Sequence, residues 1–319
     1  MSRTKFYPGV IMTVRVRAGA VALAILAIGV AQRVDAAVAD LEAMQQANAN
    51  LLFQYGFEGA DDSTRLADGS ANSYDLMRAA GGSGDVNNIQ FVPGWGGVGQ
   101  AYQPEIDVAS RSNGAGLVTT GAVPFASSSF TVEAVLQADA YSSPPDSNGR
   151  YVLAARTGQR MYMLRAYENG DDGELTTTFG DSNGDRETVI NYDAGDWLYV
   201  VLTASWNGAT TDVTWNVANL TDGDVSFTTS GTDTGLFGGD WYDGGAGSSA
   251  VGVGAFSNGT QEFFHGRIDS VALTNEVLSA NDMQGRLDAL NRPAQVPEPA
   301  TCGLLAAAAG LTLALRRRQ

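Results

Sequence analysis

Two carboxylates close together are the first place in this chain where residue types and spacing could do chemistry. Glu105 and Asp107 are separated by one residue. Hydrolysis of a glycosidic bond takes a pair of carboxyl groups, one acting as acid and the other as nucleophile or base. The residues that follow, Val108, Ala109 and Ser110, supply no second glutamate. The two-step hydrolysis needs a second glutamate, spaced from the nucleophile, to act as the acid. Without it, we expect this chain to have no enzymatic activity.

Histidine and cysteine chemistry has little to work with. His265 is the only histidine, and the only cysteine, Cys302, lies close to the C-terminus. A zinc site or a nucleophile–histidine arrangement needs more of these side chains than the chain offers. We therefore expect His265 to be a structural or surface residue, and we expect no disulfide in the main domain.

The charge of the chain separates its ends from its middle. Of the 19 Lys and Arg residues, five lie before residue 36 and three after residue 296, whereas 33 of the 35 Asp and Glu residues lie between. The middle therefore carries a net charge near −22. Such a surface repels nucleic acid and anionic lipids, so we expect no nucleic-acid partner. It favours divalent cations, which prefer oxygen ligands.

The N-terminus has the layout of a secretory signal peptide. A basic region that includes Arg15 and Arg17 precedes an apolar run from Ala18 to Ala31. Small residues at cleavage-compatible spacing follow at Ala31 and Ala36. We place the signal peptide at 1–36, with cleavage after Ala31 as the other option.

The C-terminus combines three features in order. The first is a Pro-Glu-Pro triplet, the second is a largely apolar run of 16 residues, and the third is an arginine cluster; the defining positions are Pro297, Glu298, Pro299, Arg316, Arg317 and Arg318. As a helix the run would rise about 24 Å, short of the ~30 Å hydrocarbon core of a bilayer. This arrangement resembles the PEP-CTERM sorting signal of exopolysaccharide-producing Gram-negative bacteria. The resemblance implies export, a transient stay in the inner membrane through an apolar helix at 297–319, and processing by an exosortase-type protease.

Between the two ends, the pattern predicts an all-β fold. Short segments of alternating apolar residues recur between turns rich in Gly, Asn and Asp, as in antiparallel sandwiches. The strongest strand, Asp196 to Trp206, is apolar on both faces and should be central. The Gly-, Asp- and Asn-rich region 58–99 holds one short strand candidate at 89–92. Helix formers from Asp40 to Leu52 predict a leader helix, and the leader segment is set at 37–50. Ser279 can cap a short helix at 279–291, with Asp282 at the third position to complete the capping box. The main domain is expected over 51–290, with a linker at 291–296.

Several stretches resemble the LamG-like domains of the concanavalin A-like lectin/glucanase superfamily. They are Tyr55–Glu58 with the turn Asp68–Asn72, the strand Phe130–Ala134, and the strand Phe264–Leu273, while Asp196–Val200 fits a fourth motif with Tyr199 in place of the usual histidine. The resemblance spans about residues 51–290 and implies an antiparallel jelly-roll β-sandwich.

The resemblance also implies where a metal and a ligand could bind. In jelly rolls of this type a structural calcium joins an Asp on the last strand to ligands near the first, and Asp269 and Glu58 occupy those positions. Sugar ligands stack on aromatic side chains at the sandwich rim. The candidates in polar loops are Trp95, Tyr141, Trp241 and Tyr242.

Together these features predict a secreted protein at the cell surface or in the extracellular matrix. The expected role is non-catalytic binding of carbohydrate or protein. A purely structural surface protein is the close alternative. A degenerate glucanase is a distant one, because glucanases of this superfamily use a Glu-x-Asp-x-(x)-Glu motif that Glu105 and Asp107 begin and nothing completes.

Overall fold

The computed structural model describes the chain from the leader segment to the last helix. The described residues are 37–97, 99–107, 110–125, 129–139, 150–157, 160–169, 172–179, 186–207, 210–236 and 247–291. The predicted signal peptide, the sorting segment and three of the four predicted rim aromatics, Tyr141, Trp241 and Tyr242, lie outside these ranges.

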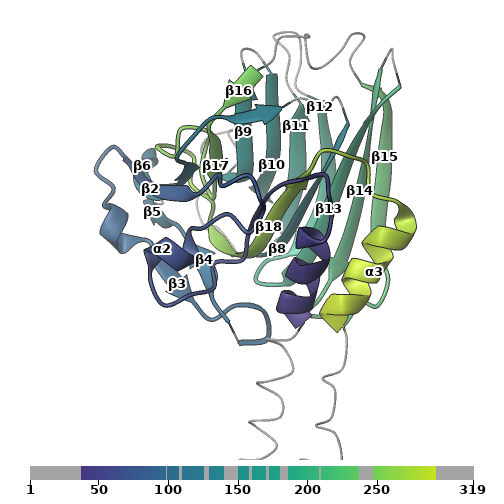
Figure 1. Ribbon diagram of the computed structural model, residues 1–319, viewed down its shortest axis with the longest axis horizontal. Coiled ribbons are helices and arrows are strands. Elements are labelled where there is room, and N and C mark those ends of the chain that lie inside the picture. Colours follow the sequence, from purple (N-terminus) through teal and green to yellow (C-terminus); the bar gives the residue numbers. More distant parts are fainter. Residues whose placement is uncertain are drawn as a thin grey trace, which may run out of the picture.

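Two eight-stranded antiparallel sheets make up the fold (Figure 1). In the first sheet the order is β15 (Thr229–Leu236), β14 (Thr211–Asn219), β13 (Trp197–Trp206), β8 (Phe130–Ala138), β18 (Gly266–Thr274), β4 (Ala101–Gln103) and β3 (Gln90–Val92), and β1 (Leu51–Tyr55) also pairs with β18. In the second it is β12 (Arg186–Asp193), β11 (Asp172–Phe179), β10 (Arg160–Asn169), β9 (Arg150–Thr157), β17 (Val251–Val253), β6 (Ser110–Thr119) and β2 (Leu76–Gly81), and β5 (Glu105–Asp107) pairs with β6. A two-stranded ribbon joins β7 (Val123–Phe125) to β16 (Gly247–Ser249). The predicted antiparallel β-sandwich is confirmed.

The helical elements are short and few among the described residues. They are the leader helix (residues 37–46), α2 (Asp62–Arg65), α3 (Ala280–Asn291) and the 3-10 turns η1 (Val86–Asn88) and η2 (Trp95–Gly97). None of these helices is long and apolar enough to cross a membrane. The apolar helix predicted at 297–319 lies outside the described part of the chain.

The core between the sheets follows the period-two rule. On β8 the side chains of Val132, Ala134 and Leu136 point inward, and each is at most 3% exposed. On the neighbouring strand β13, Leu198 and Leu202 do the same, paired with Leu136 and Val132. Because alternate residues of a strand face opposite sides, the odd-numbered residues of β8 must face away from this core.

The outer face of the first sheet carries a second apolar layer. Val135, Tyr199 and Val201 form a cluster there with Leu41 of the leader helix and Leu287 of α3. Figure 1 shows the two helices side by side across the strands β13 and β14. The sheet is therefore buried on both faces, which explains why β13 is apolar on both sides.

The turn that resembled the family motif closes the free edge of β1. Asp68 Oδ1 accepts the Gln54 backbone N–H at 3.0 Å, and Asn72 Nδ2 donates to the carbonyls of Leu51 and Leu52 at 3.1 and 2.9 Å. Unpaired backbone groups on an edge strand invite association with other chains. These side chains occupy them, so the motif has a structural role.

Two local expectations differ from the structure. The leader helix ends at residue 46, and Leu51 and Leu52, expected in the helix, open β1. The Asn50 backbone N–H donates to Asn48 Oδ1 at 2.8 Å, a local turn that competes with helix. The region 58–99, expected to hold one short strand at 89–92, also contains β2 and α2.

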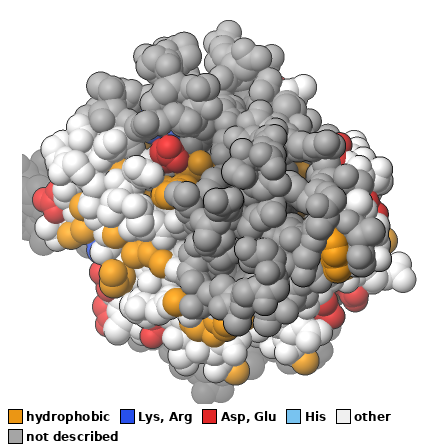
Figure 2. All heavy atoms as spheres, turned by 90° about the horizontal axis from the view of Figure 1, so that it is seen from above, with side chains coloured by type: hydrophobic (Ala, Val, Ile, Leu, Met, Phe, Trp, Pro, Cys, Tyr) orange, Lys and Arg blue, Asp and Glu red, His pale blue; other side chains and the backbone are white. Residues whose placement is uncertain are grey.

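The surface is acidic, as the composition predicts. Figure 2 shows one face, on which the described residues present several red carboxylates and little blue from basic side chains.

Candidate functional site

A glutamate is buried beneath the two helices on the outer face of the first sheet. Glu133 lies on β8, between the inward-facing Val132 and Ala134, and is 0% exposed. Tyr199 Oη on β13 donates to Glu133 Oε1 at 2.5 Å, and Arg286 Nη1 on α3 donates to Glu133 Oε2. The side chain of Gln45 on the leader helix also hydrogen-bonds to the carboxyl. One carboxylate thus joins two strands and two helices.

The electrostatics of this cluster follow from its burial. Loss of water raises the pKa of the Glu133 carboxyl, and the Arg286 guanidinium and the hydrogen bonds from Tyr199 and Gln45 oppose that rise. Burial, followed by the charge of Glu133, raises the pKa of the Tyr199 hydroxyl well above 10. Arg286 is itself 3% exposed. A substrate cannot reach Glu133, so the cluster holds the helices in place.

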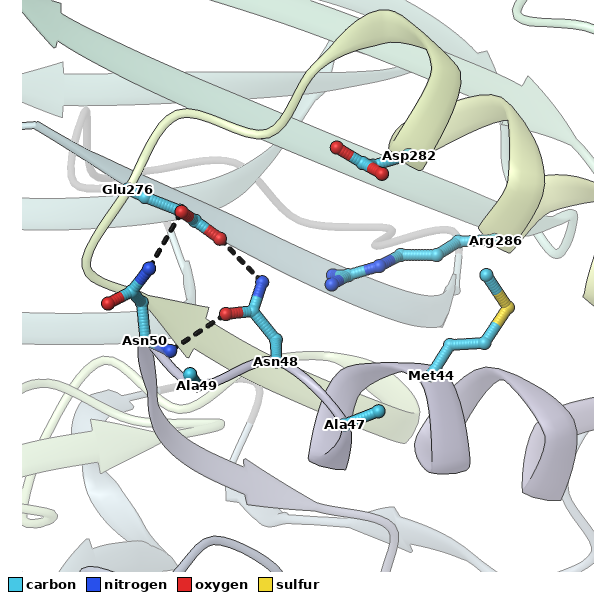
Figure 3. A pocket seen from close by; sticks show the side chains of 8 residues that line it. All are labelled: Met44, Ala47, Asn48, Ala49, Asn50, Glu276, Asp282 and Arg286. Carbon is cyan, nitrogen blue, oxygen red and sulfur yellow. Dashed lines mark hydrogen bonds between the residues drawn. The ribbon is translucent and has the colours of Figure 1, made fainter.

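An open pocket of about 400 Å³ lies directly beside this cluster, where the leader helix ends and α3 begins (Figure 3). Its walls come from the leader segment, from the loop after β18 and from the first turns of α3. The lining residues are Met44, Ala47, Asn48, Ala49, Asn50, Glu276, Asp282 and Arg286.

Hydrogen bonds fix the polar side chains of the pocket. Asn48 Nδ2 donates to Glu276 Oε1 at 2.6 Å and Asn50 Nδ2 donates to Glu276 Oε2 at 2.8 Å, as the dashed lines in Figure 3 show. Just before α3, Ser279 Oγ donates to Asp282 Oδ2 at 2.6 Å and accepts the Asp282 backbone N–H at 3.2 Å, which confirms the predicted capping pair. The guanidinium of Arg286 extends from α3 toward Asn48. The pocket therefore offers preformed donors and acceptors.

Glu58 and Asp269, the residues expected to bind calcium, hold opposite ends of one loop. Glu58 Oε1 accepts the Gln100 backbone N–H at 2.7 Å, and Asp269 Oδ2 accepts the Trp95 backbone N–H at 2.6 Å. A Cβ at Gly94 would lie 2.7 Å from Asp269 Oδ2, so the loop can approach only because that residue is glycine. These contacts give both carboxylates a structural role. No group of three or more His, Cys, Asp or Glu side chains among the described residues could hold a metal ion. Calcium at Glu58 and Asp269 stays a prediction.

Trp95 is the one predicted rim aromatic within the described residues. Its ring is half-buried and lies 6.2 Å from that of Trp197, against the helix-covered face of the first sheet. That contact is packing, and ligand binding by Trp95 stays a prediction.

Glu105 ties β5 to the turn η1. Its Oε2 accepts the Asp85 backbone N–H, and its Oε1 accepts Asn88 Nδ2 at 2.6 Å. Both oxygens of the carboxylate that begins the hydrolase-like pattern therefore have backbone or amide donors.

Sequence reasoning missed Glu133, Arg286 and the pocket. A signal for the pair was present: a glutamate interrupts the apolar strand Phe130–Ala138, and Arg286 lies three residues after Met283, on the buried side of α3. A charge on each of two elements expected to be buried indicates that the two charges meet.

Comparison with protein families finds the PEP-CTERM protein-sorting motif at residues 295–318. No curated protein matches the chain.

Three solved structures illustrate its likeness to known folds. A botulinum neurotoxin DC binding domain in complex with SialylT aligns at TM-score 0.49 and 10% identity, over 77% of this chain and 52% of the other. The NanB sialidase from Streptococcus pneumoniae aligns at TM-score 0.34 and 15% identity, over 50% of this chain and 24% of the other. The Ruminococcus gnavus IT-sialidase CBM40 bound to alpha2,3 sialyllactose aligns at TM-score 0.33 and 13% identity, over 49% of this chain and 81% of the other. This chain spans about half the length of the neurotoxin domain, and scores of this size assign it no ligand. What the chain does carry is an antiparallel β-sandwich followed by a PEP-CTERM sorting motif, which marks it for export and surface localisation.

Proposed function

We propose that this chain is a secreted, surface-sorted and non-catalytic binding module of the LamG-like type, and that its ligand is carbohydrate in the cell-surface or exopolysaccharide matrix. The proposal includes removal of the sorting tail by an exosortase-type protease after a transient stay in the inner membrane.

The observation that carries the proposal is the pocket between the leader helix and α3. Its amide, carboxylate and guanidinium groups converge on an open space of about 400 Å³ and are held in place by hydrogen bonds, Asn48 and Asn50 to Glu276, Asp282 to Ser279, and Arg286 to Glu133. Pockets with a few fixed polar groups are the usual form of small-ligand sites.

The direct test is retention of the secreted, processed protein on polysaccharide from the producing cell's own matrix and on a glycan array. We expect saturable binding of a defined set of glycans. Binding to matrix protein alone, or to nothing, would refute the carbohydrate proposal. Retention of nothing would favour the structural alternative, in which the Asn48 and Asn50 contacts to Glu276 only fasten the leader segment.

Enzymatic activity is tested on the same preparation. We expect no release of reducing sugar from β-glucans. Release that Glu105→Gln abolishes would establish the glucanase alternative instead.

A further inference from the structure

The charges around the pocket constrain the kind of ligand. Glu276 and Asp282 bring two carboxylates to its wall, and Arg286 brings the one cationic group of the lining. Arg286 already faces the buried carboxylate of Glu133. The charge that a ligand meets is therefore negative in sum, and an acidic group entering the pocket would be repelled.

The hydrogen-bonding groups constrain the ligand further. A guanidinium only donates, and an ionised carboxylate only accepts. A hydroxyl does both. Two hydroxyls on adjacent carbons could accept from Arg286 and donate to Asp282, two residues that lie one helical turn apart on α3. An amine would satisfy Asp282 and leave Arg286 facing a second cation.

Size and polarity agree with a sugar ring. The volume of about 400 Å³ lies near the lower end of the range of small-molecule pockets. Met44, Ala47 and Ala49 form an apolar side opposite the carboxylates. The C–H face of a pyranose could pack there, and the unbranched methionine side chain can adapt to it.

We propose that this pocket binds an uncharged sugar residue through adjacent hydroxyl groups, and that Asp282 and Glu276 discriminate against acidic sugars. The proposal rests on the carbohydrate-binding function and adds a site and a ligand class to it.

The test compares two isosteric variants of α3 in the secreted, processed protein. Asp282→Asn removes a pocket carboxylate. Asp288→Asn removes an exposed carboxylate on the same helix that does not line the pocket and accepts a hydrogen bond from Gln284. Thermal melts establish that both variants are folded. The probes are neutral oligosaccharides and their sialylated or uronic-acid counterparts.

We expect the unmodified protein to retain neutral probes in preference to acidic ones. Asp282→Asn should weaken neutral binding about 10-fold or more, because a hydrogen bond to a charged group is lost, while Asp288→Asn leaves binding unchanged. Asp282→Asn should also reduce the difference in affinity between neutral and acidic probes.

Three outcomes overturn the proposal and separate it from the function on which it rests. If the two variants bind neutral probes equally, the pocket is not the binding site, but the carbohydrate-binding function still stands. If the unmodified protein prefers acidic probes, the proposed discrimination against acidic sugars is refuted, but the carbohydrate-binding function still stands. Retention of no glycan removes both.

Discussion

The two faces of the first sheet are closed in different ways. Its inner face meets the second sheet through apolar side chains such as Val132 and Leu202. Its outer face meets two helices through apolar side chains as well, but with the buried ion pair of Glu133 and Arg286 in the middle and an open polar pocket at the edge. The same strands, read one residue apart, therefore form the apolar core on one side and support the buried ion pair and the pocket on the other.

The difference lies in what each interface must specify. Apolar packing is non-directional, so a range of side chains of the right volume can close the inner face. A buried ion pair is satisfied only in one geometry, and it is weak evidence for stability in itself. Here its position fixes α3, which supplies Asp282 and Arg286 to the pocket. We infer that the ion pair stabilises the position of the helix more than the fold.

Arg286→Met should have the largest effect on stability. It leaves the Glu133 carboxyl buried without its charged partner, and we expect a loss of about 3–5 kcal/mol in the free energy of unfolding. Glu133→Gln added to Arg286→Met removes the uncompensated charge and keeps the acceptor for Tyr199. The double variant should recover a large part of the loss in a denaturant titration. A single variant within about 1 kcal/mol of the parent would contradict this role of the pair.

Leu202→Ala tests the inner face, where Leu202 is 1% exposed and paired with Val132. The cavity should cost about 2–5 kcal/mol. Leu202→Met is the matched control, and it should cost less than about 1.5 kcal/mol because its volume is conserved. A methionine variant as damaging as the alanine variant would show that the inner face also demands one geometry.

Glu42 on the leader helix should make the outer face sensitive to pH. Burial, followed by the charge of Glu58, raises the pKa of the Glu42 carboxyl from 4.5 to about 7, and the side chain of Gln54 opposes the rise. Between these values the folded chain binds more protons than the unfolded chain, so this group makes stability fall as pH rises from 4.5 to 7. We expect this contribution to be about 3 kcal/mol.

Glu42→Gln should remove that part of the slope and make the protein more stable than its parent above pH 7. Asp288→Asn, on an exposed site of α3, is the control. Thermal melts of both variants across this pH window give the measurement. A Glu42→Gln variant that keeps the parental slope would contradict the assignment.

The strands that could be predicted from the sequence are those that alternate. Stretches with family resemblance became β1, β18, β8 and β13, which pair with one another in that order. In contrast, β2 and β6 were not predicted, because their sequences contain alanine and glycine where a strand pattern has larger side chains. Gly116 in β6 has a physical reason, since a Cβ there would lie 2.5 Å from that of Ala255.

The candidate site was harder to predict than the fold. The sequence places Asn48 and Asn50 near the end of the predicted leader helix and Asp282 in the cap of the predicted helix at 279–291, and it predicts no role for Glu276. Their meeting depends on where the leader segment and α3 pack on the sheet, two elements more than 220 residues apart. The local sequence pattern of each segment does not show that the two segments meet in space. The ion pair of Glu133 and Arg286 could have been predicted, because a charged side chain on each of two buried faces requires a partner.

The calcium site proposed at Glu58 and Asp269 has the smallest expected effect, because direct hydrogen bonds from Gln100 and Trp95 already hold the loop there. A cation bound only by the folded chain must raise its stability. If it binds, added calcium should raise the Tm of the secreted protein by a few degrees, chelator should reverse the rise, and Glu58→Gln should abolish the response. Glu105→Gln, which changes a carboxylate away from this loop, should respond as the parent does. A Tm unaffected by calcium and chelator would show that both carboxylates serve the loop alone.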